Sequence, residues 1–119
     1  MLIVTLSHLA NVIVVTITPL MILRNAPAMT AVYGPDTPAR RILACLYATI
    51  AAASAAALTA QFVFRQPDFS IQSAWVPFPL QIAYKLATVP AVGLRNPVVI
   101  SNLAIAVLHA MSLAVLITA

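Results

Sequence analysis

The sequence predicts an all-α integral membrane protein, a compact bundle of four transmembrane helices of which the third is short and kinked. The first observation behind this prediction is that 63% of the 119 residues are hydrophobic and 7% are charged, whereas a soluble domain carries about 25% charged residues. The second is a mean hydropathy of +1.05. Six basic and two acidic residues cannot cover a soluble surface, so lipid must solvate most of it.

The third observation is that apolar runs follow one another along the whole chain, which predicts a single transmembrane domain over residues 1–119. The basic residue Arg24 follows the first run, so we expect a retained helix, because a signal peptide has its basic residues first. Pro38 suits the first position of the second helix, with Asp36 or Thr37 as its cap. The predicted spans are residues 1–23, 42–64, 80–94 and 98–118.

The third segment differs from the other three in length. Its fifteen residues, 80–94, reach only about 22 Å, which is short of the hydrocarbon core of about 30 Å. Pro90 also interrupts it, so we expect either a kinked short span or a re-entrant segment. The connection before it holds Phe69, Trp75 and Phe78, an aromatic cluster typical of the headgroup level.

The basic residues predict an orientation. With four spans, the first and third connections lie on the same side of the membrane, and the other side holds Arg65, with Lys85 if its stem reaches back. The first and third connections hold the remaining basic residues: Arg24, Arg40, Arg41 and Arg95. This bias places them in the cytoplasm and both termini outside. A re-entrant third segment would put the termini on opposite sides. Basic residues scattered in this way form no stripe for nucleic acid.

Small residues recur every four positions in the second span. They are Ala44, Ala48, Ala52, Ala56 and Ala60. Small side chains at this spacing let another backbone approach closely, so we expect a helix-packing face. The partner can be another span of this chain or another protein, and alanine is also common in membrane helices.

Polar residues form a stripe in the first span and another in the last. Asn11 and Thr18 are seven residues apart, as are Asn102 and His109. Counted by depth, Asn11 is level with His109, and Thr18 is level with Asn102. We therefore expect hydrogen bonds between the two helices. A sharper alternative makes His8 and His109 ligands of a haem or of a chlorophyll-type pigment, or parts of a proton relay, although no cofactor is predicted in the leading interpretation.

Lys85 is a charge inside the third apolar segment. Its stem can lie along the helix while the ammonium reaches the interface beside Tyr84 and on the side of Trp75. The alternative is a buried cation that contacts an anionic ligand or a lipid phosphate. The single cysteine, Cys45, excludes an internal disulfide and a cysteine-cluster metal site.

Three short features carry a resemblance to known proteins: YGPD after the first span, QIAYK at the start of the third segment, and a polar turn before the last span. In this layout the chain resembles a loose group of small four-span bacterial inner-membrane proteins of unassigned function. The resemblance covers most of the chain. It implies an inner-membrane location and four helices, and it assigns no substrate and no catalytic residue.

The sequence contains no catalytic constellation. HExxH, GxSxG and P-loop motifs are absent, and the two carboxylates, Asp36 and Asp68, lie in connections. We therefore expect a non-catalytic accessory or structural subunit of a larger integral membrane complex, bioenergetic or photosynthetic, in a bacterial inner or intracytoplasmic membrane. Its partners would be the lipid bilayer and other membrane subunits. The alternative is a small oligomeric transporter or channel in which Lys85 and the His8 and His109 stripes line a path.

Overall fold

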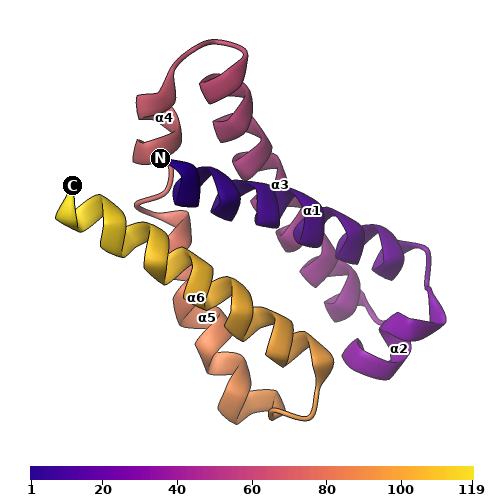
Figure 1. Cartoon of the computed structure of the whole chain (residues 1–119). Helices are drawn as coiled ribbons and strands as arrows, with labels where there is room; N and C mark the ends of the chain where they lie inside the picture. The colour runs from indigo at the N-terminus through magenta and orange to yellow at the C-terminus, as the bar shows by residue number, and fades with distance from the viewer.

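A computed structural model describes all 119 residues, and its regular secondary structure consists of helices only (Figure 1). The helices are α1 (Leu2–Leu23), α2 (Pro27–Tyr33), α3 (Pro38–Phe62), α4 (Pro67–Gln72), α5 (Pro77–Val92) and α6 (Pro97–Thr118). By length and composition, α1, α3 and α6 can cross a membrane. Helix α5 has 16 residues and reaches about 24 Å, so a fourth full span is not confirmed.

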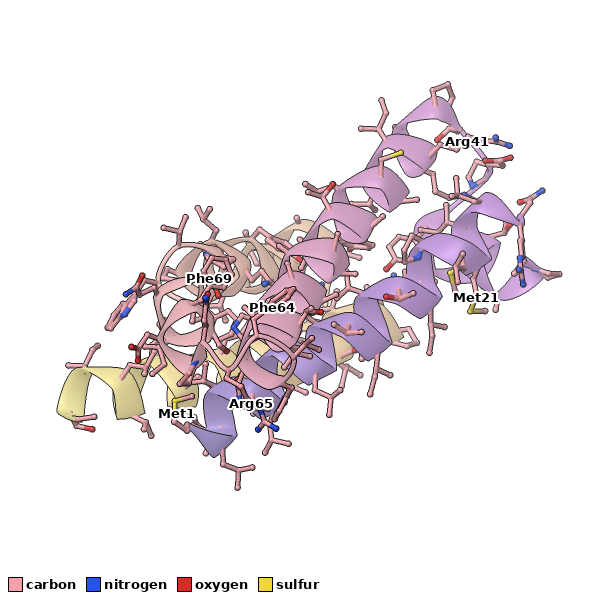
Figure 2. The ribbon with its side chains drawn as sticks, turned by 90° about the horizontal axis from the view of Figure 1, so that it is seen from above. Met1, Met21, Arg41, Phe64, Arg65 and Phe69 are labelled. Atoms are coloured by element: carbon pink, nitrogen blue, oxygen red, sulfur yellow. The ribbon has the colours of Figure 1, made fainter.

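The helices form two closely packed pairs. Helix α1 packs along α3, α5 packs along α6, and the pairs meet mainly where α1 contacts α6. In Figure 1 both termini lie at one end of the bundle with α4, and α2 and the α5–α6 turn lie at the opposite end. Figure 2 shows the same division from above, with Met1 and Arg65 at one end and Met21 and Arg41 at the other.

Local sequence sets where the helices begin and end. Five of them begin at a proline: Pro27, Pro38, Pro67, Pro77 and Pro97. Proline suits this position because its φ is already helical and the missing N–H has no helical acceptor there. The Thr37 side chain accepts a hydrogen bond from the backbone N–H of Arg40 at 3.3 Å, which confirms one of the two predicted caps. Gly34 and Gly93 follow α2 and α5 at φ 80° and 97°, a region that favours glycine.

The structure shows no break in the helix at Pro90, where the sequence predicted one. Helix α5 starts at Pro77, three residues before the predicted segment, and continues to Val92. Pro90 therefore lies in the last turn, where the hydrogen bond that it removes is close to the helix end. A kinked third helix is not confirmed.

The interior is unusually polar for so apolar a chain. The apolar clusters are small: Val4, Ala74 and Phe78 form one, and Val15 with Tyr47 belongs to another. Large apolar side chains are instead exposed along every long helix. The polar or charged residues that are buried are Ser7, His8, Asn11, Arg40, Ser54, Ser70, Gln81, Lys85, Asn102, His109 and Ser112. This distribution fits a surface that faces lipid.

Two neighbouring arginines at the start of α3 have different environments. Arg40 is 3% exposed and donates to the Gly34 carbonyl at 2.8 Å and to Asn25 Oδ1 at 2.6 Å. It thereby ties the α1–α2 connection to α3. Arg41 is exposed and donates to both carboxylate oxygens of Asp36, at 3.0 and 2.7 Å. The hydrogen bonds from Arg41 hold the pKa of the Asp36 carboxyl below its usual value.

We predict that Arg40→Met lowers the free energy of unfolding by about 1.5–3 kcal/mol, because it removes the hydrogen bonds of a buried, charged donor. The matched control is Arg41→Met, which breaks an exposed ion pair and should change stability far less. Denaturant titration of both variants in mild detergent measures the difference. If both variants lost the same free energy of unfolding, burial of the Arg40 guanidinium would not explain its contribution to stability.

Candidate functional site

Four helices contribute polar side chains to one buried cluster, which we call the histidine network: His8, Asn11, Ser54, Gln81 and His109. His8 Nδ1 lies 3.2 Å from Ser54 Oγ, and Asn11 Nδ2 donates to the same oxygen at 3.1 Å. His109 Nε2 lies 3.2 Å from Asn11 Oδ1 and 3.3 Å from Gln81 Oε1. The structure thus places His109 in hydrogen-bonding distance of the first span, at the level of Asn11.

The partners determine how the protons are arranged in this network. His8 Nε2 lies 3.1 Å from the Ser70 carbonyl in α4, and a carbonyl only accepts, so this nitrogen carries the proton. In a neutral ring, Nδ1 then accepts from the Ser54 hydroxyl, whose oxygen accepts from Asn11. His109 Nε2 must likewise donate to Asn11 Oδ1. Along the path from His109 through Asn11, Ser54 and His8 to the Ser70 carbonyl, each group therefore donates a hydrogen bond to the next one.

Phe78 separates the two histidines. Its ring stacks on His109 with centroids 4.3 Å apart and planes within 6°, and its centroid lies 4.8 Å from that of His8. The sequence placed Phe78 at the headgroup level with Trp75. In the structure Phe78 is 0% exposed whereas Trp75 is 44% exposed, because α5 begins at Pro77 and its first turn already faces the interior.

Sequence reasoning missed three residues of this site: Ser54, Ser70 and Gln81. Ser54 was hidden among alanines, although a lone hydroxyl in an apolar run needs a partner. Gln81 precedes Lys85 by four residues, so both lie on one helix face, and that signal was available. Ser70 acts through its backbone carbonyl, for which side-chain patterns give no signal.

Lys85 points into the bundle. It is 2% exposed, its Nζ donates to Asn102 Oδ1 at 3.1 Å, and the nitrogen lies 4.9 Å from the centre of the Tyr84 ring. Asn102 also lies 3.5 Å from the Thr88 hydroxyl. The expected extension of the ammonium toward the interface near Trp75 is therefore absent. The physical reason is that α5 packs along α6, which brings an amide oxygen within reach on the inner side.

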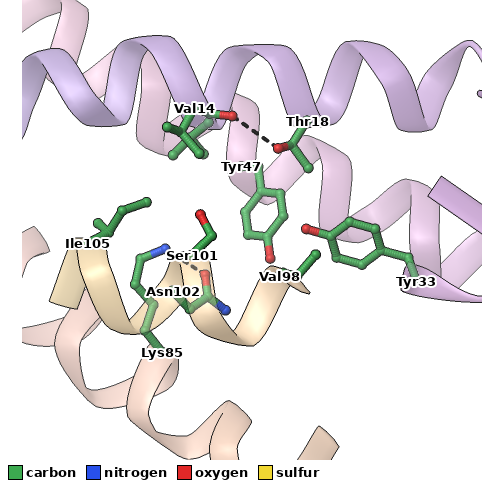
Figure 3. A pocket seen from close by; sticks show the side chains of 10 residues that line it. Val14, Thr18, Tyr33, Tyr47, Lys85, Val98, Ser101, Asn102 and Ile105 are labelled. Atoms are coloured by element: carbon green, nitrogen blue, oxygen red, sulfur yellow. Dashed lines mark hydrogen bonds between the residues drawn. The ribbon is translucent and has the colours of Figure 1, made fainter. Parts of the chain in front are cut away.

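A cavity of about 60 Å³ adjoins this lysine (Figure 3). Helix α1 contributes Val14 and Thr18 to its wall, α3 contributes Tyr47, and α6 contributes Ser101 and Asn102. Thr18 and Asn102, which were expected to meet, face this cavity together. The Thr18 hydroxyl instead donates to the Val14 carbonyl of its own helix at 3.0 Å.

A second, larger cavity lies beside the first. It measures about 330 Å³, and nine of its twelve lining residues are hydrophobic. The two cavities share Tyr33, Tyr47, Val98 and Asn102. Leu46 and Val92 line the larger cavity and are 54% and 59% exposed. The larger cavity therefore opens on the lateral surface.

Lys85 has no acidic partner. The chain has two carboxylates: Asp36 is paired with Arg41, and Asp68 is exposed in α4. Tyr84 offers only its ring face to the ammonium. The buried ammonium is therefore met by one amide oxygen and one aromatic ring face.

The five alanines that recur every four residues do not form one face. Ala44 and Ala60 are buried, whereas Ala48, Ala52 and Ala56 are exposed. The reason is that a step of four residues turns about 400°, so the stripe drifts by about 40° at each step. The inner face of α3 follows the closer spacing of Ala44, Tyr47, Ala51, Ser54 and Ala57.

The outer alanines contribute to a groove between α3 and α1. This groove has a volume of about 290 Å³ and is lined on the α3 side by Ala48, Ala51, Ala52 and Ala55. On the α1 side it is lined by Val12, Thr16, Pro19, Leu20 and Leu23. We call it the alanine groove.

The histidines do not fit a haem or a chlorophyll-type pigment. Their side chains are 1% and 0% exposed, and a macrocycle would need space beside the ring nitrogen. Each Nε2 already has an oxygen partner within 3.3 Å. The structure brings together no group of three His, Cys, Asp or Glu side chains that could hold a metal ion.

Fold and site define the class of the molecule: an all-helical protein with three helices able to cross a membrane, packed around a polar, hydrogen-bonded interior. No model of a known protein family, no curated protein and no solved structure matches the chain. The resemblance noted from the short motifs is therefore not supported by a defined family.

We predict that His109→Leu destabilises the fold modestly. Hydrogen bonds between helices in membranes contribute about 0.6 kcal/mol on average and at most about 1.7 kcal/mol, and leucine keeps much of the packing on Phe78. Denaturant unfolding in detergent measures the loss, and Leu108→Ala serves as a control beside the network on the same helix. A visible absorption band that is present in the purified protein and lost in the variant would contradict a purely structural role.

Proposed function

We propose that this protein is a non-catalytic accessory subunit of a larger integral membrane complex. The observation that carries the proposal is the alanine groove, which small side chains leave open between α1 and α3. Grooves of this kind let a second helix approach closely, and close packing is a main source of affinity between helices in lipid. The docked element would be a transmembrane helix of another subunit.

The state of the polar residues supports the same proposal. In the histidine network His8, Asn11 and Ser54 bond to one another or to the backbone, so they hold α1, α3 and α4 together. A catalytic site would need a reactive group that faces a substrate space, and these groups are used by the fold. The outer surface, by contrast, is apolar on every long helix.

For the arrangement in the membrane, we propose that α5 crosses together with α6, which gives four crossings in a bacterial inner membrane. The two helices pack along each other, and Figure 1 shows α5 running from the end that holds α4 toward the end that holds α2. Pro77 and Gly93 bound a helix that is only about 6 Å shorter than the hydrocarbon core. Such mismatch is accommodated by local thinning.

This topology makes a direct prediction about the two sides of the membrane. Four crossings and the arginine bias place α2 in the cytoplasm and both termini outside. Reporter fusions after Met29 and after Ala119 should therefore report opposite compartments, and a fusion after Arg65 should match Ala119. Matching signals from Met29 and Ala119 would mean that α5 does not cross.

A substitution in the alanine groove tests the docking role. Ala52→Leu adds volume to a surface that is exposed in the single chain, so we expect the variant to fold normally and to lose its partner. The readout is the size of the assembly after purification from native membranes in mild detergent, together with thermal stability. Ala53→Leu is the matched control, because Ala53 is exposed and does not line the groove. An assembly that persists unchanged in Ala52→Leu would refute docking at this groove.

A second candidate function is that of a small oligomeric transporter or channel. The observation that favours it is Lys85, a buried cation beside a cavity and without an acidic partner. Intramembrane charges usually face a path or a ligand. Purification as a homogeneous small oligomer, with no other protein present, would favour this candidate over the accessory subunit.

A further inference from the structure

Lys85 is a buried charge without an acidic partner. An ammonium has three N–H groups to donate, and one of them reaches Asn102 Oδ1. Burial of a cation away from water is costly unless it is paired. The chain itself supplies no carboxylate at this position, because Asp36 is paired with Arg41 and Asp68 is exposed in α4. An anion from outside the chain would provide the pairing that the chain lacks.

The space beside the lysine restricts the size of that anion. The adjoining cavity of about 60 Å³ has room for about four to six water-sized groups. Figure 3 shows the Lys85 amine beside Ser101 and Asn102, with the Tyr47 hydroxyl directed toward the same space. Few hydrogen-bond donors therefore face this small cavity. A carboxylate, with two acceptor oxygens and three heavy atoms, fits this chamber better than a phosphodiester headgroup does.

The neighbouring cavity indicates what is attached to the carboxylate. It is about five times larger in volume than the first, and most of its wall is apolar. Its volume of about 330 Å³ is within the range of about 300–1,000 Å³ that is typical of small-molecule sites. The exposed rim at Leu46 and Val92 opens it sideways, in the direction from which a hydrocarbon chain in the bilayer would enter.

From this juxtaposition we propose that the protein binds a single-chain lipid carboxylate, with its head on Lys85 and Asn102 and its hydrocarbon tail in the larger cavity. Tyr47, which lines both cavities together with Tyr33, would flank the junction between head and tail. The inference does not depend on the accessory role. The two cavities beside Lys85 share no lining residue with the alanine groove, so a result that refutes one proposal leaves the other standing.

Binding of radiolabelled dodecanoate to the full chain in phosphatidylcholine nanodiscs tests this inference. We expect saturable binding that excess unlabelled dodecanoate displaces and that dodecanol and acetate do not. Loss of a charge-assisted hydrogen bond corresponds to about tenfold or more in affinity, so Lys85→Met should weaken binding at least that much. Lys85→Met should fold, since it removes an unpaired buried charge, and helical content and elution volume verify this.

A second pair of variants tests the tail separately. Leu46→Trp narrows the lateral opening and should weaken dodecanoate binding, whereas Ile42→Trp, which is one turn away, exposed and outside the cavity wall, should not. Unchanged binding in Lys85→Met would overturn the proposal. Equal competition by acetate would show a small-anion site that does not use the tail cavity, and equal competition by dodecyl phosphate would overturn the carboxylate assignment.

Discussion

The structure depends on one constraint: polar groups that hydrocarbon surrounds must find their partners inside the protein. Each unpaired polar group in the bilayer core costs free energy, because no water is present there to form a hydrogen bond with it. The chain meets most of this constraint by turning polar side chains of α1, α3, α5 and α6 toward one another, and it leaves Gln81 Nε2, Tyr84 OH and His109 Nδ1 without a partner. His8, Asn11 and Ser54 then position the helices more specifically than the small apolar clusters can. The fold is therefore organised by hydrogen bonds inside and by lipid outside.

The two ends of the bundle satisfy this constraint differently. Near the termini α1 and α6 are in direct contact, and the Ser7 and Ser112 hydroxyls are 2.7 Å apart. Serine permits this approach because it is small. Toward the other end, Tyr33 and Tyr47 stand between the helix pairs, and the cavities begin there. Lys85 lies where close packing gives way to open space, which is why a single lysine dominates the chemistry of that region.

Much of the fold was predictable because membrane-spanning helices can be recognised from the length and composition of their apolar runs. The predicted segments 1–23 and 98–118 nearly coincide with α1 and α6, and the cap at Thr37 followed from local rules. The site was less predictable. Depth counting paired Asn11 with His109, but the same counting paired Thr18 with Asn102, and there α1 and α6 have already diverged around a cavity.

The direction in which a side chain leaves its helix was the main source of difference. Lys85 has a long stem that can reach the interface or the interior, and only the position of Asn102 decides between them. Phe78 and Trp75 are three residues apart and were grouped together, yet a helix start at Pro77 buries the one and exposes the other. The alanine stripe failed as a single face because its repeat of four differs from the helical period of 3.6.

The common direction of donation in the histidine network has a consequence for proton transfer. From His109 through Asn11 and Ser54 to His8, each group donates to the next, so no single bond can reverse without reversing its neighbours. Asn11 accepts on its oxygen and donates from its nitrogen, and a proton cannot pass from one atom to the other within the amide. The amide of Asn11 therefore interrupts proton transfer along this chain of hydrogen bonds. The ordered bonds serve to orient the helices.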